Sequence, residues 1–231
     1  MRTNDPGAQV VADAYKRTKG PVAFLDESYQ APDRVETHRE TFYIFTAVVV
    51  DLKEMHELRT GLREIADHPR WHTTDALLTA AGREKTQDML GYLSDGFETC
   101  VIAHQIRVDQ DDLDAERARR ICYRELATEL ASGRTGVWDP IDLFVLEERN
   151  QRNFRNKDRA NHSELLSEGR IPRTTRLLQT SPHHERLLWL PDLVSSAFRR
   201  TITHRDATRE MFEIIKDQVH FVELEQEPSS P

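Results

Sequence analysis

The sequence predicts an α/β protein in which a mixed β-sheet is flanked by helices. The chain has 231 residues, of which 38% are hydrophobic and 31% charged, a composition typical of one large domain with a sizeable core. Short runs of apolar and β-branched residues alternate with longer stretches of helical periodicity. This alternation favours a sheet covered by helices over an all-helical or all-strand fold.

Five segments have the composition of strands. In chain order they are Val22–Leu25, Phe42–Val50, Phe97–Val108, Ile141–Leu146 and Thr174–Gln179. The strongest is Phe42–Val50, because it is almost unbroken aromatic and β-branched sequence. The polar segment Gln30–Glu40 suits a hairpin connection between the first two strands, and Thr174–Gln179 is expected at a sheet edge.

Five other segments carry apolar residues at helical spacing. They are Leu52–Asp67, Asp75–Leu93, Asp111–Leu130, His184–Thr203, which Pro191 interrupts, and Ala207–Val219. The segment Arg149–Gly169 is polar and lacks this spacing, so we expect a loop with a short helix near Ser163–Leu166.

The domain organisation follows from these elements. We expect an N-terminal extension over 1–20, one domain over 21–222 and an acidic flexible tail over 223–231. No run approaches the roughly 18–20 apolar residues that span a bilayer, and residues 1–20 lack the apolar stretch of a signal peptide. Cys100 and Cys122 show no metal-ligand spacing, which fits buried thiols in a reducing compartment. We therefore expect a cytoplasmic protein without a membrane partner.

Charge is unevenly distributed along the chain. The net charge of −8 argues against indiscriminate binding of nucleic acid, but residues 149–209 contain 13 basic and only 6 acidic side chains. Within this segment, a basic arm over residues 149–176 is rich in arginine, whose planar guanidinium suits phosphate. Its candidate nucleic-acid contacts are Arg149, Arg152, Arg155, Lys157, Arg159, Arg173 and Arg176. The alternative is that these side chains pair with carboxylates of the same protein.

Acidic residues follow two of the predicted strands. Asp26 and Glu147 each come one residue after an apolar run, so their carboxylates converge if the two strands are neighbours in the sheet. Asp192 lies on the polar side of an otherwise apolar helix, together with Ser195 and Ser196. Each acid could instead have a purely structural role: a turn for Asp26, surface pairing with Arg149 or Arg152 for Glu147, and a helix opening after Pro191 for Asp192.

Three converging carboxylates are suited to Mg²⁺ or Mn²⁺, because hard cations prefer oxygen ligands. Metals held in this way polarise phosphate and activate water, which indicates phosphodiester hydrolysis. His72, His183 and His184 lie near predicted helix starts and could supply a ligand or a general acid or base, or could simply be solvated or capping residues. The sequence contains no HExxH, GxSxG, P-loop or GxGxxG motif.

Three segments together resemble a known bacterial and phage family, the domain of unknown function thirty-eight-hundred. They are FLDES (residues 24–28), LEER (146–149) and LLWLPDLVSSAFRR (187–200), and WHTTD (71–75) is similar to the family's histidine-containing segment. The resemblance implies a ribonuclease H-like fold with a helical insertion after the second strand. It also implies Asp26, Glu147 and Asp192 as metal-binding acids, with Glu27 and His72 as accessory catalytic candidates.

The sequence departs from that family at three positions. Tyr29 follows the Asp-Glu-Ser run where the family has a small residue, Glu147 stands where Asp is commoner, and Pro191 replaces Ala before Asp192. The leading hypothesis is a divalent-metal-dependent nuclease acting on DNA or RNA, with a link to mobile elements or defence. Alternatives are a non-catalytic subunit of a nucleic-acid-associated complex that binds a protein partner, and a metal-dependent hydrolase of small phosphorylated molecules.

Overall fold

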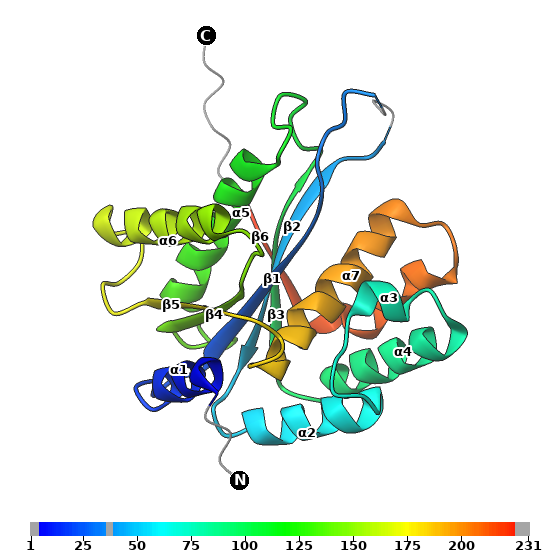
Figure 1. Cartoon of the computed structure of the whole chain (residues 1–231), viewed down its shortest axis with the longest axis horizontal. Coiled ribbons are helices and arrows are strands. Elements are labelled where there is room, and N and C mark those ends of the chain that lie inside the picture. Colours follow the sequence, from blue (N-terminus) through cyan, green and yellow to red (C-terminus); the bar gives the residue numbers. More distant parts are fainter. Residues whose placement is uncertain (1–4, 36–38, 225–231) are drawn as a thin grey trace.

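A computed structural model describes residues 5–35 and 39–224, which form a mixed six-stranded sheet between two layers of helices (Figure 1). The strands are β1 (Val22–Gln30), β2 (Phe42–Val50), β3 (Thr99–Ile106), β4 (Leu143–Glu147), β5 (Arg176–Thr180) and β6 (Val219–Val222). Their order across the sheet is β5-β4-β1-β2-β3-β6. Strands β1, β2 and β3 are antiparallel neighbours, whereas β4 runs parallel to β1 and β5 parallel to β4. This mixed sheet flanked by helices confirms the predicted α/β class.

The helices cover both faces of the sheet. They are α1 (Pro6–Tyr15), α2 (Met55–Ala66), α3 (Thr73–Ala76), α4 (Ala80–Ser94), α5 (Glu116–Ser132), α6 (Arg152–Ser167) and α7 (Trp189–Thr203), with 3₁₀ turns η1 (Arg186–Leu188), η2 (Ala207–Ile214) and η3 (Lys216–Gln218). Helices α2, α3 and α4 all lie between β2 and β3, which confirms the predicted helical insertion.

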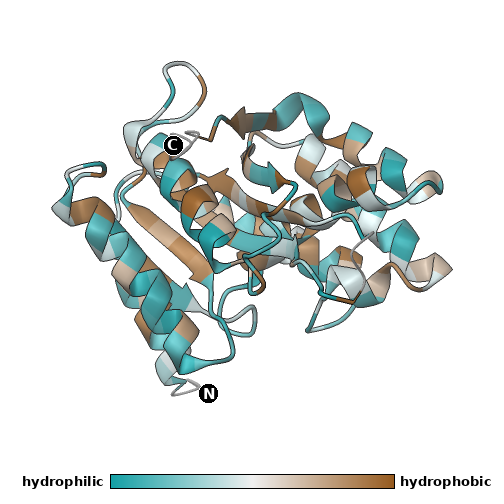
Figure 2. Ribbon diagram, turned by 90° about the horizontal axis from the view of Figure 1, so that it is seen from above, coloured by the Kyte–Doolittle hydropathy of each residue, from teal (hydrophilic) through white to brown (hydrophobic). Residues whose placement is uncertain are grey.

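Two hydrophobic clusters fill the space between sheet and helices. Helix α7 packs on β1 and β2 on one face, and α5 packs on β2 and β3 on the other. Side chains alternate along β1, so Phe24 joins the cluster under α7 and Leu25 joins the cluster under α5. Seen from above, hydrophobic residues mark the strands between the helical layers (Figure 2). This alternation decides which face each polar residue of β1 occupies.

Several element boundaries differ from the sequence prediction. Strand β1 continues through Gln30 because its polar second half pairs with Phe42–Thr46 of β2. Backbone pairing therefore extends the strand beyond the apolar run that predicted it. The predicted helix Asp75–Leu93 divides into α3 and α4. Residues 207–218 form 3₁₀ turns, and Val219–Val222 forms a strand on β3, so the predicted α-helix Ala207–Val219 is wrong.

The segment predicted to be a polar loop is mostly the helix α6. Its buried side includes Asp158, Asn161 and His162 in addition to Leu165, and these polar residues hide the helical pattern from hydropathy. Asp158 pairs with buried arginine, and His162 contacts the hydroxyl of Tyr123 at 2.8 Å. The prediction of a loop over Arg149–Gly169 is therefore wrong because buried side chains need not be apolar when they are paired.

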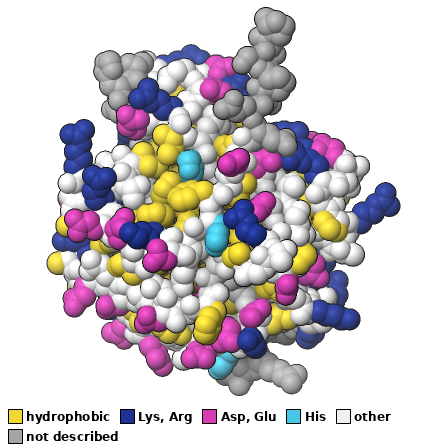
Figure 3. Space-filling view, turned by 180° about the vertical axis from the view of Figure 1, so that it is seen from behind, with side chains coloured by type: hydrophobic (Ala, Val, Ile, Leu, Met, Phe, Trp, Pro, Cys, Tyr) yellow, Lys and Arg dark blue, Asp and Glu magenta, His cyan; other side chains and the backbone are white. Residues whose placement is uncertain are grey.

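The ends of the chain and its surface add three facts. Helix α1 occupies part of the predicted N-terminal extension and packs on β5, whereas residues 225–231 of the predicted acidic tail lie outside the described residues. None of the described helices has the length and apolarity needed to cross a membrane, and Cys100 and Cys122 are buried free thiols. Hydrophobic side chains gather on the face opposite to that of Figure 1 (Figure 3), and the exposed hydrophobic residues of β3 and β6 include Ile106 and Phe221.

Candidate active site

Strands β1 and β4 bring two acidic residues side by side. Leu25 of β1 is opposite Leu146 of β4 in the parallel ladder, and both belong to the cluster under α5. The next residue of each strand points to the other face of the sheet, so Asp26 and Glu147 both face α7. Asp26 lies within its strand and Glu147 is the last residue of its own, whereas the sequence placed each one position beyond a strand.

Helix α7 supplies the third acid. Asp192 lies in the first turn of α7, and its Oδ2 accepts a hydrogen bond from the backbone N–H of Thr73, the first residue of α3, at 3.0 Å. The hydroxyl of Ser196, one turn later, lies 3.5 Å from Oδ1 of Asp192. Pro191 falls in the same first turn, where its missing N–H has no intrahelical partner to lose, so the helix continues through it.

The three acids line one open cleft with a volume of about 680 Å³. Its wall also contains Glu27, Trp71, His72, Glu148, Arg149, Phe154, Ser196 and Arg199. The volume falls within the range of small-molecule and cofactor sites, and the openness of the cleft leaves room for a longer ligand to enter.

Burial and neighbouring carboxylates raise the pKa values of Asp26 and Glu147. Burial raises the pKa of Asp26 well above its usual range, and the carboxylates of Glu147, Glu27 and Asp192 raise it further. Burial likewise raises the pKa of Glu147 to about 7, with Asp192 and Glu27 contributing. Neighbouring carboxylates disfavour ionisation in this way when no cation compensates them.

The donor set of this cluster fits a divalent cation. No ion pair within residues 5–35 and 39–224 involves Asp26, Glu147 or Asp192, although Arg199 is close enough to interact electrostatically with Asp192. Carboxylate oxygens are the ligands that Mg²⁺ and Mn²⁺ prefer, and a cation would relieve the repulsion that raises the two pKa values. Asp26, Glu147 and Asp192 are therefore the residues that would hold such a metal.

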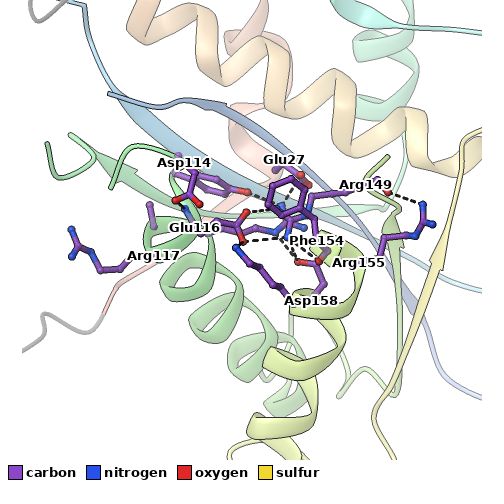
Figure 4. Close-up of polar contacts among 12 residues, drawn as sticks. Glu27, Asp114, Glu116, Arg117, Arg149, Phe154, Arg155 and Asp158 are labelled. Carbon is purple, nitrogen blue, oxygen red and sulfur yellow. Dashed lines mark hydrogen bonds and ion pairs between the residues drawn. The ribbon is translucent and has the colours of Figure 1, made fainter. Parts of the chain in front are cut away.

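Glu27 lies on the opposite face of β1 in a buried ionic network (Figure 4). Its Oε1 lies 2.6 Å from Arg119 Nη1, and Arg119 Nε donates to Asp158 Oδ1 at 2.8 Å. Arg119 Nη1 also donates to the hydroxyl of Tyr43 at 2.7 Å, and the guanidinium stacks on the ring of Phe45. Glu27 is thus an ion-pair partner of Arg119, although its charge still affects Asp26 and Glu147 across the strand.

Arg149 extends this network towards the surface. Its guanidinium pairs with Glu116, contacts Asp158 at 3.2 Å and lies over the ring of Phe154 (Figure 4). Lys157 is 3.3 Å from Glu116, on the same helix turn as Asp158. These basic side chains are occupied by intramolecular partners, as one of the two sequence hypotheses for the arm expected.

The other basic candidates divide by exposure. Arg155 donates to backbone oxygens of Arg149 and Asn150, and Arg176 donates to Ala14 O and to the hydroxyl of Thr18. Arg159 contacts only the side chain of Asn156 among the hydrogen bonds of the described residues. Arg152 and Arg173 are exposed, and neither forms a salt bridge with a residue of the described ranges.

The histidines lie in two places. His72 caps the N-terminus of α3 at the rim of the acidic cleft, is exposed, and has its Nδ1 3.7 Å from Asp75 Oδ2. His183 and His184 lie in the turn before η1, and neither lines this cleft. Only His72 is therefore placed to act on a ligand bound between the acids.

The structure adds to the acidic site two residues that the sequence did not place beside the acids. Arg199 lines the cleft seven residues after Asp192, and residues seven apart share a helix face, so its spacing was a usable signal. Trp71 lines the same cleft and donates from Nε1 to Thr73 Oγ1 at 3.0 Å. Of the two serines grouped with Asp192, Ser196 lines the cleft and Ser195 is buried elsewhere in α7.

Comparison with known proteins gives only remote likenesses. No family model matches this sequence, and no curated protein matches it. Among solved structures, a ribonuclease HIII, Bst-RNase HIII, crystallised in complex with Mn²⁺, is similar with a TM-score of 0.48 and 12% identity over 94% of this chain and 67% of its own. A mutant of the same enzyme has a TM-score of 0.41 and 12% identity, with 94% of this chain and 69% of its own covered.

Proposed function

We propose that this protein is a divalent-metal-dependent nuclease whose metal site is formed by Asp26, Glu147 and Asp192. The observation that carries the proposal is that these three carboxylates line one cleft and repel one another, with no ion-pair partner among the described residues. Burying like charges together is costly, so such an arrangement is retained where a cation completes it. Mg²⁺ or Mn²⁺ bound there supplies Lewis-acid polarisation of a phosphate and an activated water.

The chain's own side chains take distinct roles in this proposal. Asp26 and Glu147 hold the cation from the rigid sheet, and Asp192 holds it from α7, where the Thr73 N–H fixes one of its oxygens at 3.0 Å. Arg199 lies on the same wall as Asp192 and binds a non-bridging phosphate oxygen. His72 at the rim gives or takes a proton at the leaving or attacking oxygen.

An open cleft favours a polynucleotide over a small phosphorylated molecule. The cleft runs from the acids past Glu148 and Phe154 at the start of α6, so a substrate longer than one nucleotide can lie along it. Arg152 is exposed at the first position of α6, and Arg173 is exposed before β5. Both side chains are available for backbone phosphates of DNA or RNA.

The test is a comparison of Asp26→Asn with the wild-type protein. Asn removes the charge and keeps the volume, so the fold is retained while metal binding and cleavage are lost. We would titrate Mn²⁺ by calorimetry and then incubate each protein with labelled single- and double-stranded DNA and RNA. The matched control is Asp75→Asn, which changes an exposed carboxylate of α3 beside the cleft and is expected to keep both activities.

Three results would count against the proposal. Cleavage by a correctly folded Asp26→Asn protein would remove Asp26 from the site. Metal binding without cleavage of any of the four substrates would favour a small phosphorylated substrate. A wild-type protein that binds no Mn²⁺ would favour the non-catalytic interaction subunit.

A further inference from the structure

A second group of potential metal ligands lies outside the acidic cleft. Asp5, His183 and His184 each place one ligand atom within 4.8 Å of the others. Asp5 is the residue that caps α1, and the two histidines lie in the turn that follows β5 and leads into η1 and α7. The cluster therefore joins the N-terminal helix to the segment that carries Asp192 (Figure 1).

The two oxygens of Asp5 have different surroundings. Oδ1 accepts a hydrogen bond from the N–H of Gly7 at 2.9 Å, which is the usual interaction of a helix-capping carboxylate. Oδ2 lies 3.2 Å from Nδ1 of His184. A carboxylate with one oxygen fixed by a hydrogen bond and the other directed at an imidazole nitrogen is oriented as metal-binding carboxylates are.

The nitrogen of His184 that faces Asp5 is buried and lacks a hydrogen bond. Nδ1 has almost no solvent-accessible area, and its contact with Asp5 does not have the geometry of a hydrogen bond. Buried polar atoms without a partner are rare in folded proteins, and an ion or a water often explains them. This unsatisfied nitrogen points to a ligand between the two side chains, independently of the composition of the cluster.

Packing around His184 fixes the direction of its ring. A Cβ atom on Gly7 would lie 2.4 Å from Nε2 of His184, so the first turn of α1 lies close against the ring. The ring of His183 meets that of His184 edge to face, with 5.1 Å between the centroids. Because Nδ1 is the ring nitrogen that faces Asp5, it is the nitrogen that His184 would offer to a metal shared with Asp5.

We propose that Asp5, His183 and His184 form a second divalent-metal site that is suited to Zn²⁺ and fastens α1 to the turn preceding α7. Imidazole is a ligand preferred by zinc and by other late transition metals, whereas the all-carboxylate cluster in the cleft favours Mg²⁺ or Mn²⁺. Two imidazoles and one carboxylate supply three ligands, and water takes the fourth position. The proposal does not depend on the proposed nuclease function, because none of these three residues lines the acidic cleft.

Metal titration of point variants tests this site. We would remove metal from the purified protein with a chelator, exchange it into buffer with excess Mg²⁺ to saturate the carboxylate cluster, and titrate Zn²⁺ by calorimetry. We expect one Zn²⁺ per chain for the wild-type protein. His183→Ala changes an exposed side chain, so it is expected to fold normally and to lower the Zn²⁺ affinity by at least about tenfold.

Two controls separate this site from the acidic cleft. His72→Ala removes an exposed histidine beside the cleft, and Asp26→Asn removes a carboxylate within it, so both are expected to bind Zn²⁺ as the wild-type protein does. Co²⁺ is a spectroscopic probe for the same purpose, because a tetrahedral site with nitrogen ligands gives intense visible absorption bands. These bands are expected in the wild-type protein and in Asp26→Asn, and are expected to disappear in His183→Ala.

Thermal unfolding tests the fastening role. A metal that binds only the folded chain raises the melting temperature in proportion to the logarithm of its concentration above Kd. At the same concentration, Zn²⁺ should therefore raise the melting temperature of the wild-type protein more than that of His183→Ala. The proposal is overturned if wild-type protein binds no Zn²⁺ in the presence of Mg²⁺, or if His183→Ala binds it with unchanged affinity.

Discussion

Asp26 and Glu27 are consecutive residues of β1, yet the two faces of the sheet surround their carboxylates very differently. Asp26 faces α7 beside Glu147 and Asp192, with no cationic ion-pair partner among the described residues. Glu27 faces α5 and pairs at 2.6 Å with Arg119, which also binds Asp158. One face thus has carboxylates without an ion-pair partner among the described residues, and the other has carboxylates that the chain neutralises itself. The difference separates a candidate functional site from a structural one.

The largest expected effect on the free energy of unfolding comes from the face of the sheet on which Glu27 pairs with Arg119. Arg119→Met leaves Glu27 buried without its cation and leaves Asp158 with Arg149 at 3.2 Å, and breaking a buried pair in this way costs about 3–5 kcal/mol. The side chain of Arg119 is only 5% exposed, so water cannot replace it. We expect the free energy of unfolding in urea to fall by that amount.

A neighbouring arginine provides the control. Arg120 pairs with Glu164, but its side chain is 47% exposed, and exposed pairs contribute no more than about 1 kcal/mol. Arg120→Met is therefore expected to change the free energy of unfolding only slightly. Equal losses in the two variants would contradict the view that the Glu27 face is held together by Arg119.

The second effect concerns the face without a cation and depends on pH. The pKa of Glu147 rises from 4.5 to about 7 on folding, so the folded chain binds this proton more tightly than the unfolded chain. The resulting stabilisation is present below pH 4.5 and is lost as the pH rises through 7, and at about 1.4 kcal/mol per unit it amounts to about 3 kcal/mol. Without divalent cations, the free energy of unfolding should fall between pH 5 and pH 8.

The variant Glu147→Gln isolates this contribution. Its free energy of unfolding should decline less than that of the wild-type protein over the same pH range, and saturating Mg²⁺ should reduce the decline in the wild-type protein but not in Glu147→Gln. Glu164→Gln, which changes an exposed carboxylate of α6, is the matched control and should behave as the wild-type protein does. Parallel pH profiles for all three proteins would show that the acids in the cleft are not coupled.

The sequence predicted the sheet side of the site better than its helical side. Apolar runs before Asp26 and Glu147 place both acids on adjacent strands, because buried strands leave a strong local signal. The pairing of Asp26 with Glu147 depends on the ladder register between Leu25 and Leu146, which no local pattern encodes. Alternation along β1 explains why Glu27, grouped with Asp26 in the sequence, lies in a different environment.

The basic arm illustrates a different reason for failure. The buried side of helix α6 includes Asp158, Asn161 and His162. Because these residues are polar, hydrophobic residues do not recur at helical spacing along the segment. Arginines that the sequence assigned to phosphate contact instead neutralise Glu116 and Asp158, whose positions come from α5 and α6 together. A charge count along the chain cannot distinguish Arg149, which pairs with Glu116 33 residues earlier in the sequence, from an arginine that is exposed.

The smallest expected effect separates these two kinds of arginine. Arg152 and Arg173 are exposed, so replacing both with Ala should change the free energy of unfolding by no more than about 0.5 kcal/mol for each residue. If the protein is a nuclease as proposed, the same double variant should bind DNA or RNA more weakly. For duplex DNA, the slope of log affinity against log salt should fall by about 0.9 for each phosphate that the variant no longer neutralises. Binding would be measured by fluorescence anisotropy at several salt concentrations, without divalent metal so that the substrate stays intact.

A matched loss of charge elsewhere tests whether the position of the two arginines matters. Lys53 and Lys216 are also exposed, and neither lines the acidic cleft. Replacing both with Ala removes the same charge, so the general electrostatic repulsion of nucleic acid by this acidic protein rises equally in the two double variants. A larger loss of affinity in the arginine variant therefore assigns Arg152 and Arg173 to the nucleic-acid surface. Equal losses of affinity would limit the basic contacts of the proposed nuclease to Arg199 and the cleft. The arginines paired with Glu116 and Asp158 could not bind phosphate instead, because leaving those carboxylates would cost stability, as expected for Arg119→Met.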